Sequence, residues 1–394
     1  MRGQATEMRS ARSSETVIAR KSAMHAKGGP RDVLGGLRAL ASGLPAEWRG
    51  RFASAVPSRR VCLAVFLAAA APGAAADRGS GGPVPVAVPR ASGEAPALAP
   101  KLLALAVVGG PGDQWVQEVG FLSSGSVYGR GPGGSFTVLY SREGRYLGLS
   151  GNPAAPGAGT KGRNFAVNDK VRNPYDGTTW SYGYKQVAPQ LQQPYLYSPF
   201  GWTWWDWTEA QAGNQRADTR CVGLWFQSKD RFVAQTWSDG GNTVQANDPR
   251  DVKVYHKLCG NGGRSKSFFL EGDAKTGEPL AGLAFSHRPQ AACFDGWGRF
   301  YVSQALEQHP DCLDLGGSRH AGFCAADANL RPLASGTFVQ DGQSLAMALQ
   351  GGLLVVGGSV SAGGAAAALP KLVNPAQPGP GGGEDGFIAL VKLW

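Results

Sequence analysis

Apolar and polar positions follow one recurring pattern along this chain, and residues 291–306 show it most clearly. An apolar run reaches Phe294, a short turn contains Asp295 and Gly298, and a second run alternates apolar with small or polar side chains. Asp and Gly accept the positive φ angles of tight hairpin turns, and a period of two suits a strand buried on one face. The stretch therefore predicts a β-hairpin.

The pattern returns three more times, and each copy is followed by a second unit, which in the last case is a single apolar run. The other copies are residues 118–131, 222–237 and 344–360, and the second units are residues 135–151, 267–285, 322–338 and 386–394. Two hairpins make one four-stranded antiparallel sheet, and serial sheets of that size are typical of propeller blades. The predicted fold class is therefore all-β: a β-propeller with at least four four-stranded blades.

The alternation of apolar-D-x-x-G-x-apolar-apolar-V-x-G with G-F-apolar-apolar-x-D-x-x-G resembles the β-propeller repeats of secreted bacterial proteins. Repeats of that family often end in D-G/A-F-apolar-A-apolar, and residues 385–390, DGFIAL, fit this ending. The resemblance covers roughly residues 101–150 and 221–394. It implies an architecture and no fixed function, since such propellers serve many functions. The copies are unevenly spaced, so the number of blades stays open between four and a larger ring.

Residues 151–220 interrupt the repeat and predict an irregular, aromatic-rich insertion. One hypothesis makes it a ligand platform anchored by Trp202 and Trp204, which an extended strand places on one face. The alternative, which we favour, is an insertion that caps the propeller and buries its own rings. If the chain binds a ligand, we expect the site on the face that this insertion covers.

Composition and charge narrow the class of protein. The 394 residues include 58 Gly and 26 Pro and only 17% charged residues, which favours a turn-rich β protein over a helical one. Residues 1–76 hold 12 of the 39 Lys and Arg but 4 of the 29 Asp and Glu, so the net charge of +10 falls to +2 for the remainder. No basic footprint for DNA or RNA remains, and we expect no nucleic-acid partner.

The basic leader contains an export signal. Arg59 and Arg60 precede an apolar run over residues 61–71, and small residues precede Asp77, which together predict a signal peptide over residues 58–76. The run is too short to cross a bilayer of about 30 Å, so no stable membrane anchor is expected. Residues 58–63 partly resemble a twin-arginine motif, and the ordinary secretory route is the alternative. The predicted location is secreted, periplasmic or at the cell surface.

The flanking segments complete the predicted domain organisation. Residues 1–57 are interpreted as a disordered leader or a mis-assigned start, with an organelle transit peptide as the rival. Residues 77–100 are rich in Pro, Gly and Ala and predict a linker that does not order itself. The propeller domain is expected over residues 101–394, with its first strand near Lys101.

Five cysteines remain after removal of the signal, which carries Cys62. In an oxidising compartment this odd number favours two disulfides and one thiol. Cys312 with Cys324 would close a short loop, Cys221 with Cys259 is the second expected pair, and Cys293 is the expected buried thiol. No C-x-x-C occurs and the histidines are scattered, so we expect no metal site and no cofactor.

Catalytic motifs are weak in this sequence. Residues 228–237 resemble the Asp-box of sialidases, but Phe232 replaces its Gly. Asp206 and Glu209 are a carboxylate pair that nothing in the sequence brings together, so we expect solvated surface acids. His320 beside Arg319 would suit a lyase acting on a uronate, but we expect an ordinary loop residue. We therefore expect a secreted, monomeric and non-enzymatic propeller that binds a carbohydrate or a protein, or serves as a structural module. The alternative is an exported propeller enzyme, a lyase or hydrolase acting on polysaccharide.

Overall fold

The computed structural model describes residues 87–110, 112–153, 169–188, 191–204, 219–238, 253–255, 266–285, 288–304, 312–313, 321–361, 363, 372–375 and 383–394. The chain divides into two compact units, Met1–Asp77 and Arg78–Trp394, and every described residue belongs to the second. The predicted leader and signal peptide lie outside the described residues.

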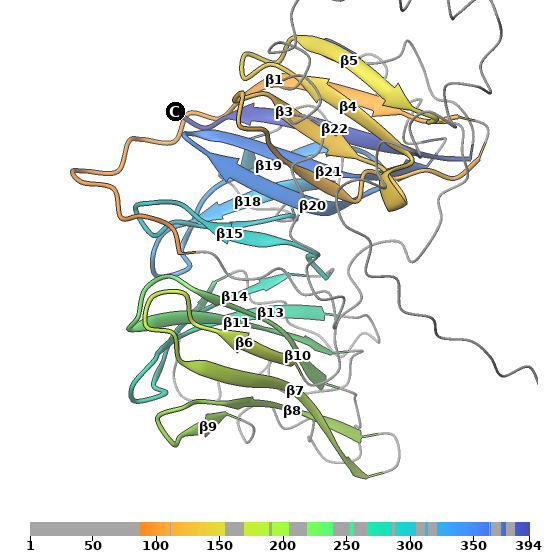
Figure 1. The fold of residues 1–394 in the computed structure, drawn as a ribbon. Coiled ribbons are helices and arrows are strands. Elements are labelled where there is room, and N and C mark those ends of the chain that lie inside the picture. Colours follow the sequence, from red (N-terminus) through yellow and green to blue (C-terminus); the bar gives the residue numbers. More distant parts are fainter. Residues whose placement is uncertain are drawn as a thin grey trace, which may run out of the picture. The chain divides into compact units, whose positions relative to one another are not determined.

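The described strands form five β-sheets, which we number in chain order (Figure 1). Sheets 1 and 2 are antiparallel meanders, in which each strand pairs with the next one along the chain. Sheet 1 contains β2 (Glu118–Phe121), β3 (Val127–Arg130), β4 (Phe136–Tyr140) and β5 (Tyr146–Gly151), with the short 3₁₀ helix η1 (Pro132–Gly134) before β4. Sheet 2 contains β6 (Asp169–Arg172), β7 (Thr179–Ala188), β8 (Leu191–Tyr197) and β9 (Thr203–Trp204).

Sheets 3 and 4 each contain the same antiparallel meander of four strands and one additional strand. This short fifth strand pairs in parallel with the fourth strand of the meander. Sheet 3 contains β10 (Thr219–Phe226), β11 (Arg231–Ser238), β13 (Lys266–Asp273), β14 (Pro279–Phe285) and the added β12 (Lys253–Tyr255). Sheet 4 contains β15 (Ala292–Phe294), β16 (Phe300–Val302), β18 (Ala321–Ala326), β19 (Pro332–Val339) and the added β17 (Cys312–Leu313).

Sheet 5 joins the two ends of the described chain. Its members are β20 (Gly342–Gln350), β21 (Leu353–Ser361), β22 (Glu384–Lys392) and β1 (Lys101–Val108). β1 lies antiparallel to β22, with Val107 opposite Phe387, so the first strand completes the sheet made by the last three.

These sheets confirm the predicted fold class. The chain is all-β, every hairpin expected from the repeat is present, and the serial four-stranded antiparallel sheets have the architecture of propeller blades. The prediction of an irregular insertion is wrong for residues 169–204, because these residues form the regular sheet 2. The first residues of its strand β7 alternate, because Trp180 and Tyr182 point into a buried cluster whereas Thr179 and Ser181 are at least partly exposed.

Close packing explains why the sequence Asp-Gly-Phe occurs at residues 385–387. Phe387 is fully buried, and a Cβ added to Gly386 would lie only 3.1 Å from the Val108 carbonyl oxygen and from the Val116 amide nitrogen. Asp385 is also fully buried, with its carboxylate against Gly109. The motif therefore marks the point where β22 passes close to the backbone that leads from β1 into sheet 1.

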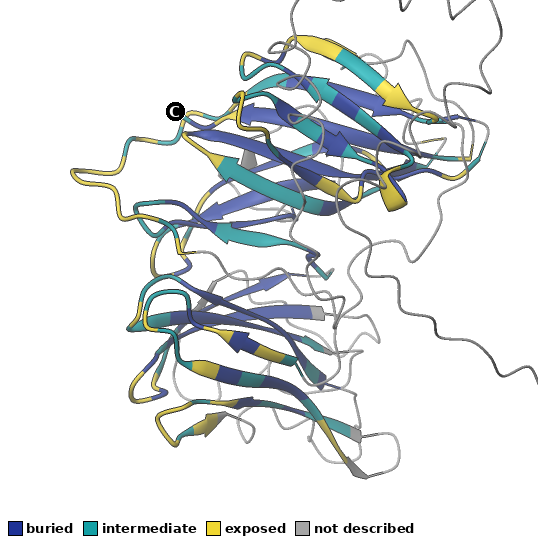
Figure 2. Cartoon of the chain, in the orientation of Figure 1, coloured by how far each residue is buried: buried dark blue, intermediate teal, exposed yellow. Residues whose placement is uncertain are grey.

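Four hydrophobic clusters lie between neighbouring sheets, and Figure 2 shows the strands that supply them as mostly buried. β22 serves two of them: Phe387 and Ala389 face sheet 4, whereas Ile388 and Leu390 face sheet 1. A strand buried on both faces reads as a continuous apolar run, as this one does. The other two clusters join sheet 4 to sheet 3 and sheet 3 to sheet 2.

Residues 87–100 follow a defined path, although the sequence predicts a linker that does not order itself. We call this segment the strap. Its backbone bonds to three sheets: the Ala91 amide donates to the Gly296 carbonyl at 2.8 Å, the Ala99 amide donates to the Leu393 carbonyl at 2.7 Å, and the Val88 amide donates to the Tyr175 hydroxyl at 3.1 Å. Backbone hydrogen bonds therefore order this segment, together with Val88 and Leu98, which pack against two of the hydrophobic clusters.

The buried faces of β22 give a test of the fold. Replacing Phe387 by Ala removes a fully buried ring from the cluster between sheets 5 and 4 and should lower the free energy of unfolding by about 3–5 kcal/mol. Leu147→Ala, at a side chain 51% exposed on β5, is the control and should change it by less than about 0.5 kcal/mol. Urea unfolding measures both, and equal midpoints for the two variants would contradict this packing.

Candidate functional site

The hairpin turns that join first to second and third to fourth strands lie at one end of each sheet, which we call the turn edge. Acceptor side chains at the start of these turns fix their shape: Asp273, Asp295 and Asp327 each accept hydrogen bonds from backbone amides two to four residues later. The strap crosses this edge at Tyr175, Gly296 and Leu393. Two hollows lie on it.

Trp202, one of the two predicted ligand anchors, is a packing residue at this edge. Its ring centroid lies 5.3 Å from that of Trp180 and 5.6 Å from that of Phe232, and its indole N–H donates to the Ala274 carbonyl at 2.9 Å. It thus joins sheet 2 to sheet 3. A Cβ added to Gly277 would lie 2.5 Å from the ring, so the neighbouring turn leaves no space beside it. The side chain of Trp204 lies outside the described residues.

The expected disulfides are not shown by the structure. The Ser335 backbone pairs with Cys324 on one side and with Cys312 on the other, so two strand spacings, about 10 Å, separate these two cysteines. A disulfide spans Cα separations up to about 7 Å, and this register does not support the bond. Cys221 is buried and its thiol donates to the Gly223 carbonyl at 3.8 Å; its predicted partner Cys259 lies outside the described residues. Burial and the nearby Asp295 raise the pKa of the Cys293 thiol to about 12.

A buried ion pair anchors the strap where it passes sheet 4. Arg299 Nε lies 2.6 Å from Asp295 Oδ2, and the same oxygen accepts from the Tyr301 hydroxyl at 3.0 Å. Arg299 Nη1 donates to the Pro96 carbonyl of the strap at 2.8 Å. The guanidinium also lies over the ring of Trp394, 4.7 Å from its centroid, and so fixes this aromatic side chain beside the first hollow.

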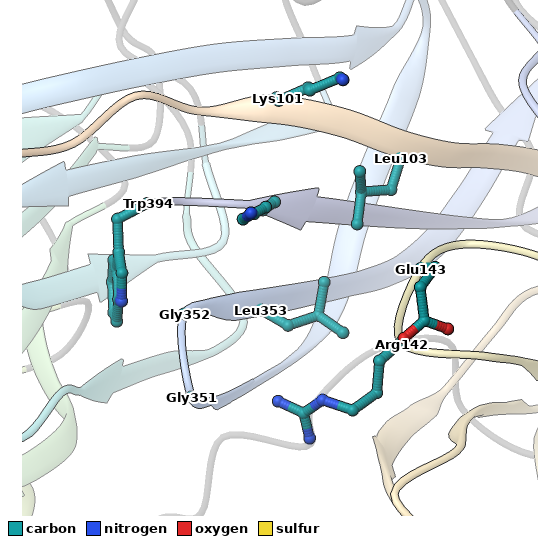
Figure 3. Close-up of a pocket in the computed structure, with 9 residues that line it drawn as sticks. Lys101, Leu103, Arg142, Glu143, Gly351, Gly352, Leu353 and Trp394 are labelled. Carbon is teal, nitrogen blue, oxygen red and sulfur yellow. The ribbon is translucent and has the colours of Figure 1, made fainter.

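The first hollow is a groove of about 390 Å³ where sheet 5 meets the turns of sheet 1 (Figure 3). We call it the basic groove. Its lining residues are Lys101, Leu103, Arg142, Glu143, Gly351, Gly352, Leu353, Lys392 and Trp394. Three cationic side chains against one side-chain carboxylate give its side chains a net positive charge, although residues 77–394 as a whole are nearly neutral. The groove is therefore a local concentration of positive charge.

Two of these cations are direct neighbours across strands. Lys101 of β1 lies opposite Lys392 of β22, and both side chains are exposed. Within the described part of the chain, neither lysine forms an ion pair with a carboxylate. Like charges opposite one another destabilise a sheet pair, so an anion bound between the two ammonium groups would relieve this repulsion.

Arg142 approaches the groove from the β4–β5 turn of sheet 1. Its Nη1 donates to Gln350 Oε1 at 3.0 Å and its Nη2 to the Gln350 carbonyl at 2.9 Å, and its guanidinium lies over the ring of Phe121. The side chain is therefore held in place before any ligand arrives. Next to it, a hydrogen bond with Ser141 and the nearby arginines lower the pKa of Glu143, which keeps this exposed carboxyl ionised.

Gly352 and Trp394 close one end of the groove. The indole nitrogen of Trp394 lies on the side of the ring nearest Gly352, where an added Cβ would come within 2.9 Å of it (Figure 3). Gly352 has φ +77°, a conformation that favours glycine, and its lack of a side chain lets the turn approach the ring.

The second hollow, of about 500 Å³, lies between the strap and the turns of sheets 2 and 3. Ala87, Val88, Pro89 and Arg90 line it with Tyr175 and residues 227–230. Its charged lining residues are Arg90, Lys229 and Asp230, and Asp230 also pairs with Lys275 at 3.3 Å. It holds fewer cations than the basic groove.

The sequence analysis selected none of the residues of the basic groove. Asp206, Glu209, Arg319 and His320, which it considered for catalysis, lie outside the described residues. Among the described residues, no three His, Cys, Asp or Glu side chains are placed to hold a metal ion. No helix in the described part of the chain is long and apolar enough to cross a bilayer.

Comparisons with known proteins do not assign the chain to a family. No family model and no curated protein matches it. Among solved structures it is similar to Raptor of Chaetomium thermophilum (9% identity, TM-score 0.26), covering 76% of this chain and 29% of Raptor. It is also similar to a GH43_1 enzyme of Xanthomonas citri in complex with xylose (11%, TM-score 0.23; 74% and 89% covered) and to a protein of unknown function from Bacteroides caccae (10%, TM-score 0.18; 59% and 98% covered). These similarities are too low to inform function.

Trp202 gives a test of packing against ligand binding. Trp202→Ala should lower the free energy of unfolding by about 3 kcal/mol, because its ring fills the junction of sheets 2 and 3. Gly277→Ala should also destabilise, since φ is +72° there and the new Cβ meets the ring. Thermal melting measures both, and a Trp202→Ala variant that melts like the wild type would restore the ring as a candidate ligand platform.

A buried carboxyl between sheets 3 and 4 predicts a pH dependence of stability. Glu271 is 1% exposed, and burial raises its pKa to about 7, although Arg231 Nη1 lies 2.6 Å from its Oε1 and acts in the opposite direction. The unfolded chain releases this proton near pH 4.5, so between that pH and about 7 the folded chain binds more protons. Stability should therefore fall as pH rises through this window.

Glu271→Gln should remove this fall in the free energy of unfolding with rising pH. Urea unfolding at pH 5 and pH 7.5 should show the wild type losing on the order of 1–3 kcal/mol more than the variant across the interval. Glu278→Gln, at an exposed position in the β13–β14 turn of the same sheet, should keep the wild-type profile. Parallel profiles for wild type and Glu271→Gln would contradict the assignment.

Proposed function

We propose that this chain is an exported, monomeric and non-enzymatic binding module, and that its ligand carries negative charge and occupies the basic groove. The sequence supports export through its leader, and the resemblance to propeller repeats of secreted bacterial proteins agrees with it. The blades supply a rigid base on which a binding surface can be held.

The observation that carries the proposal is the pair Lys101 and Lys392. Their positions opposite one another place two ammonium groups on one exposed surface, and no described carboxylate neutralises either. Most charged surface residues are independent of one another, whereas these two are fixed side by side by strand register. An anion between them gains from both at once.

The other lining residues favour binding over a purely structural role. Hydrogen bonds to Gln350 hold Arg142 before binding, so little side-chain freedom is lost when a ligand docks. The cation–π contact with Arg299 likewise holds Trp394. A pre-arranged set of donors around an apolar floor is the usual form of a small ligand site.

Binding of dextran sulfate to the full chain tests the proposal. The double variant Lys101→Gln/Lys392→Gln should weaken binding at least five-fold at low salt, because two charge contacts are lost, and binding should vanish near 0.5 M NaCl. The control Lys170→Gln/Lys229→Gln removes the same charge at two exposed lysines outside the groove and should leave the affinity unchanged. Equal losses in both double variants, measured by biolayer interferometry, would refute a specific site.

A further inference from the structure

The cations of the basic groove do not converge on one point. Figure 3 shows Lys101 and Arg142 on opposite sides of Leu353, and Leu103 and Leu353 line the space between them. The paired lysines come from sheet 5, whereas Arg142 comes from a turn of sheet 1. Cations on opposite sides of an apolar residue suit a ligand with at least two negative groups separated by an uncharged, partly apolar body.

The negative charge of Glu143 places a second requirement on the ligand. It lines the same groove beside Arg142, and its lowered pKa keeps it ionised. A carboxylate accepts hydrogen bonds and repels other anions, so the ligand must present a donor at this point. A sulfate ion has no donor and a hydrogen phosphate ion has a single one, whereas a sugar ring carries several hydroxyl groups that donate.

We infer that the basic groove binds a polysaccharide built from uronic acids. This inference rests on the proposed function and names its ligand class. One carboxylate lies between Lys101 and Lys392, a second reaches Arg142, the apolar face of the sugar ring rests on Leu103 and Leu353, and a hydroxyl group donates to Glu143. A nucleic acid fits less well, because its sequence-independent affinity comes from Lys and Arg contacts to several phosphates and the groove holds three cations.

Oligogalacturonates of four units are the probe, and the fully methyl-esterified oligomer is the matched neutral control. Isothermal titration with the full chain should show micromolar to millimolar binding of the acid and at least ten-fold weaker binding of the ester. Lys392→Gln should weaken binding of the acid about three- to five-fold, and Lys170→Gln should not change it. Equal affinity for the acid and the ester would overturn the inference.

Glu143→Ala separates a uronate site from a general anion site. Removing the acceptor should weaken oligogalacturonate binding about two- to five-fold, whereas removing the negative charge should strengthen dextran sulfate binding. Tighter binding of both ligands would show that Glu143 only repels, which contradicts a hydroxyl contact.

Three outcomes distinguish this inference from the proposed function. Lysine-dependent binding of dextran sulfate without binding of oligogalacturonate would overturn the uronate assignment and leave the anion site standing. Equal or tighter binding of poly-glutamate or of a single-stranded oligodeoxynucleotide at matched charge would assign the groove to another macromolecule and also overturn it. Failure of every anion to bind through Lys101 and Lys392 would overturn both.

Discussion

The pairing of β1 with β22 is the constraint on which the rest of the described structure depends. It completes sheet 5, and sheet 5 then buries both faces, one against sheet 1 and one against sheet 4. The same pairing sets Lys101 opposite Lys392 and leaves Leu103 at a bulge between Leu102 and Ala104, so this register determines how β1 and β22 line the basic groove. A shift by one residue would exchange the side chains packed against sheet 1 with those packed against sheet 4, so the different shapes of the two clusters specify the register.

The blades could be predicted because each hairpin is specified by local sequence. Its two apolar runs and the turn between them lie within about 17 residues, and Asp295 and Asp273 accept hydrogen bonds in their turns, as their positions suggest. Sheet 2 escaped prediction because β6, with the sequence DKVR, has one apolar side chain to bury. Its inward residues, Trp180 and Tyr182, become recognisable only against the cluster that sheet 3 provides.

The basic groove could not be predicted from sequence in the same way. Its residues come from β1, from the β4–β5 turn, from the β20–β21 turn and from the end of β22, and no local pattern links them. The density of aromatic residues suggested Trp202 as a ligand anchor instead. Its ring packs against Phe232 and Trp180, because large aromatic side chains commonly fill the space between sheets. The ordered path of the strap could not be predicted for another reason. It depends on backbone hydrogen bonds and on Arg299, and amino-acid composition does not indicate such contacts.

The completion of sheet 5 by β1 also sets the order of events during synthesis. β1 leaves the ribosome about 280 residues before β22, so its amides and carbonyls wait without their native partner while sheets 1 to 4 are made. A chain with such a distant pairing folds slowly, because loop closure must precede the contacts that reward it. Slow completion would keep the chain open for the export that we propose. Cutting the chain between sheets 2 and 3, removing residues 1–86 and joining the strap to Trp394 would make the pairing local, and such a circular permutant should fold faster to the same set of blades.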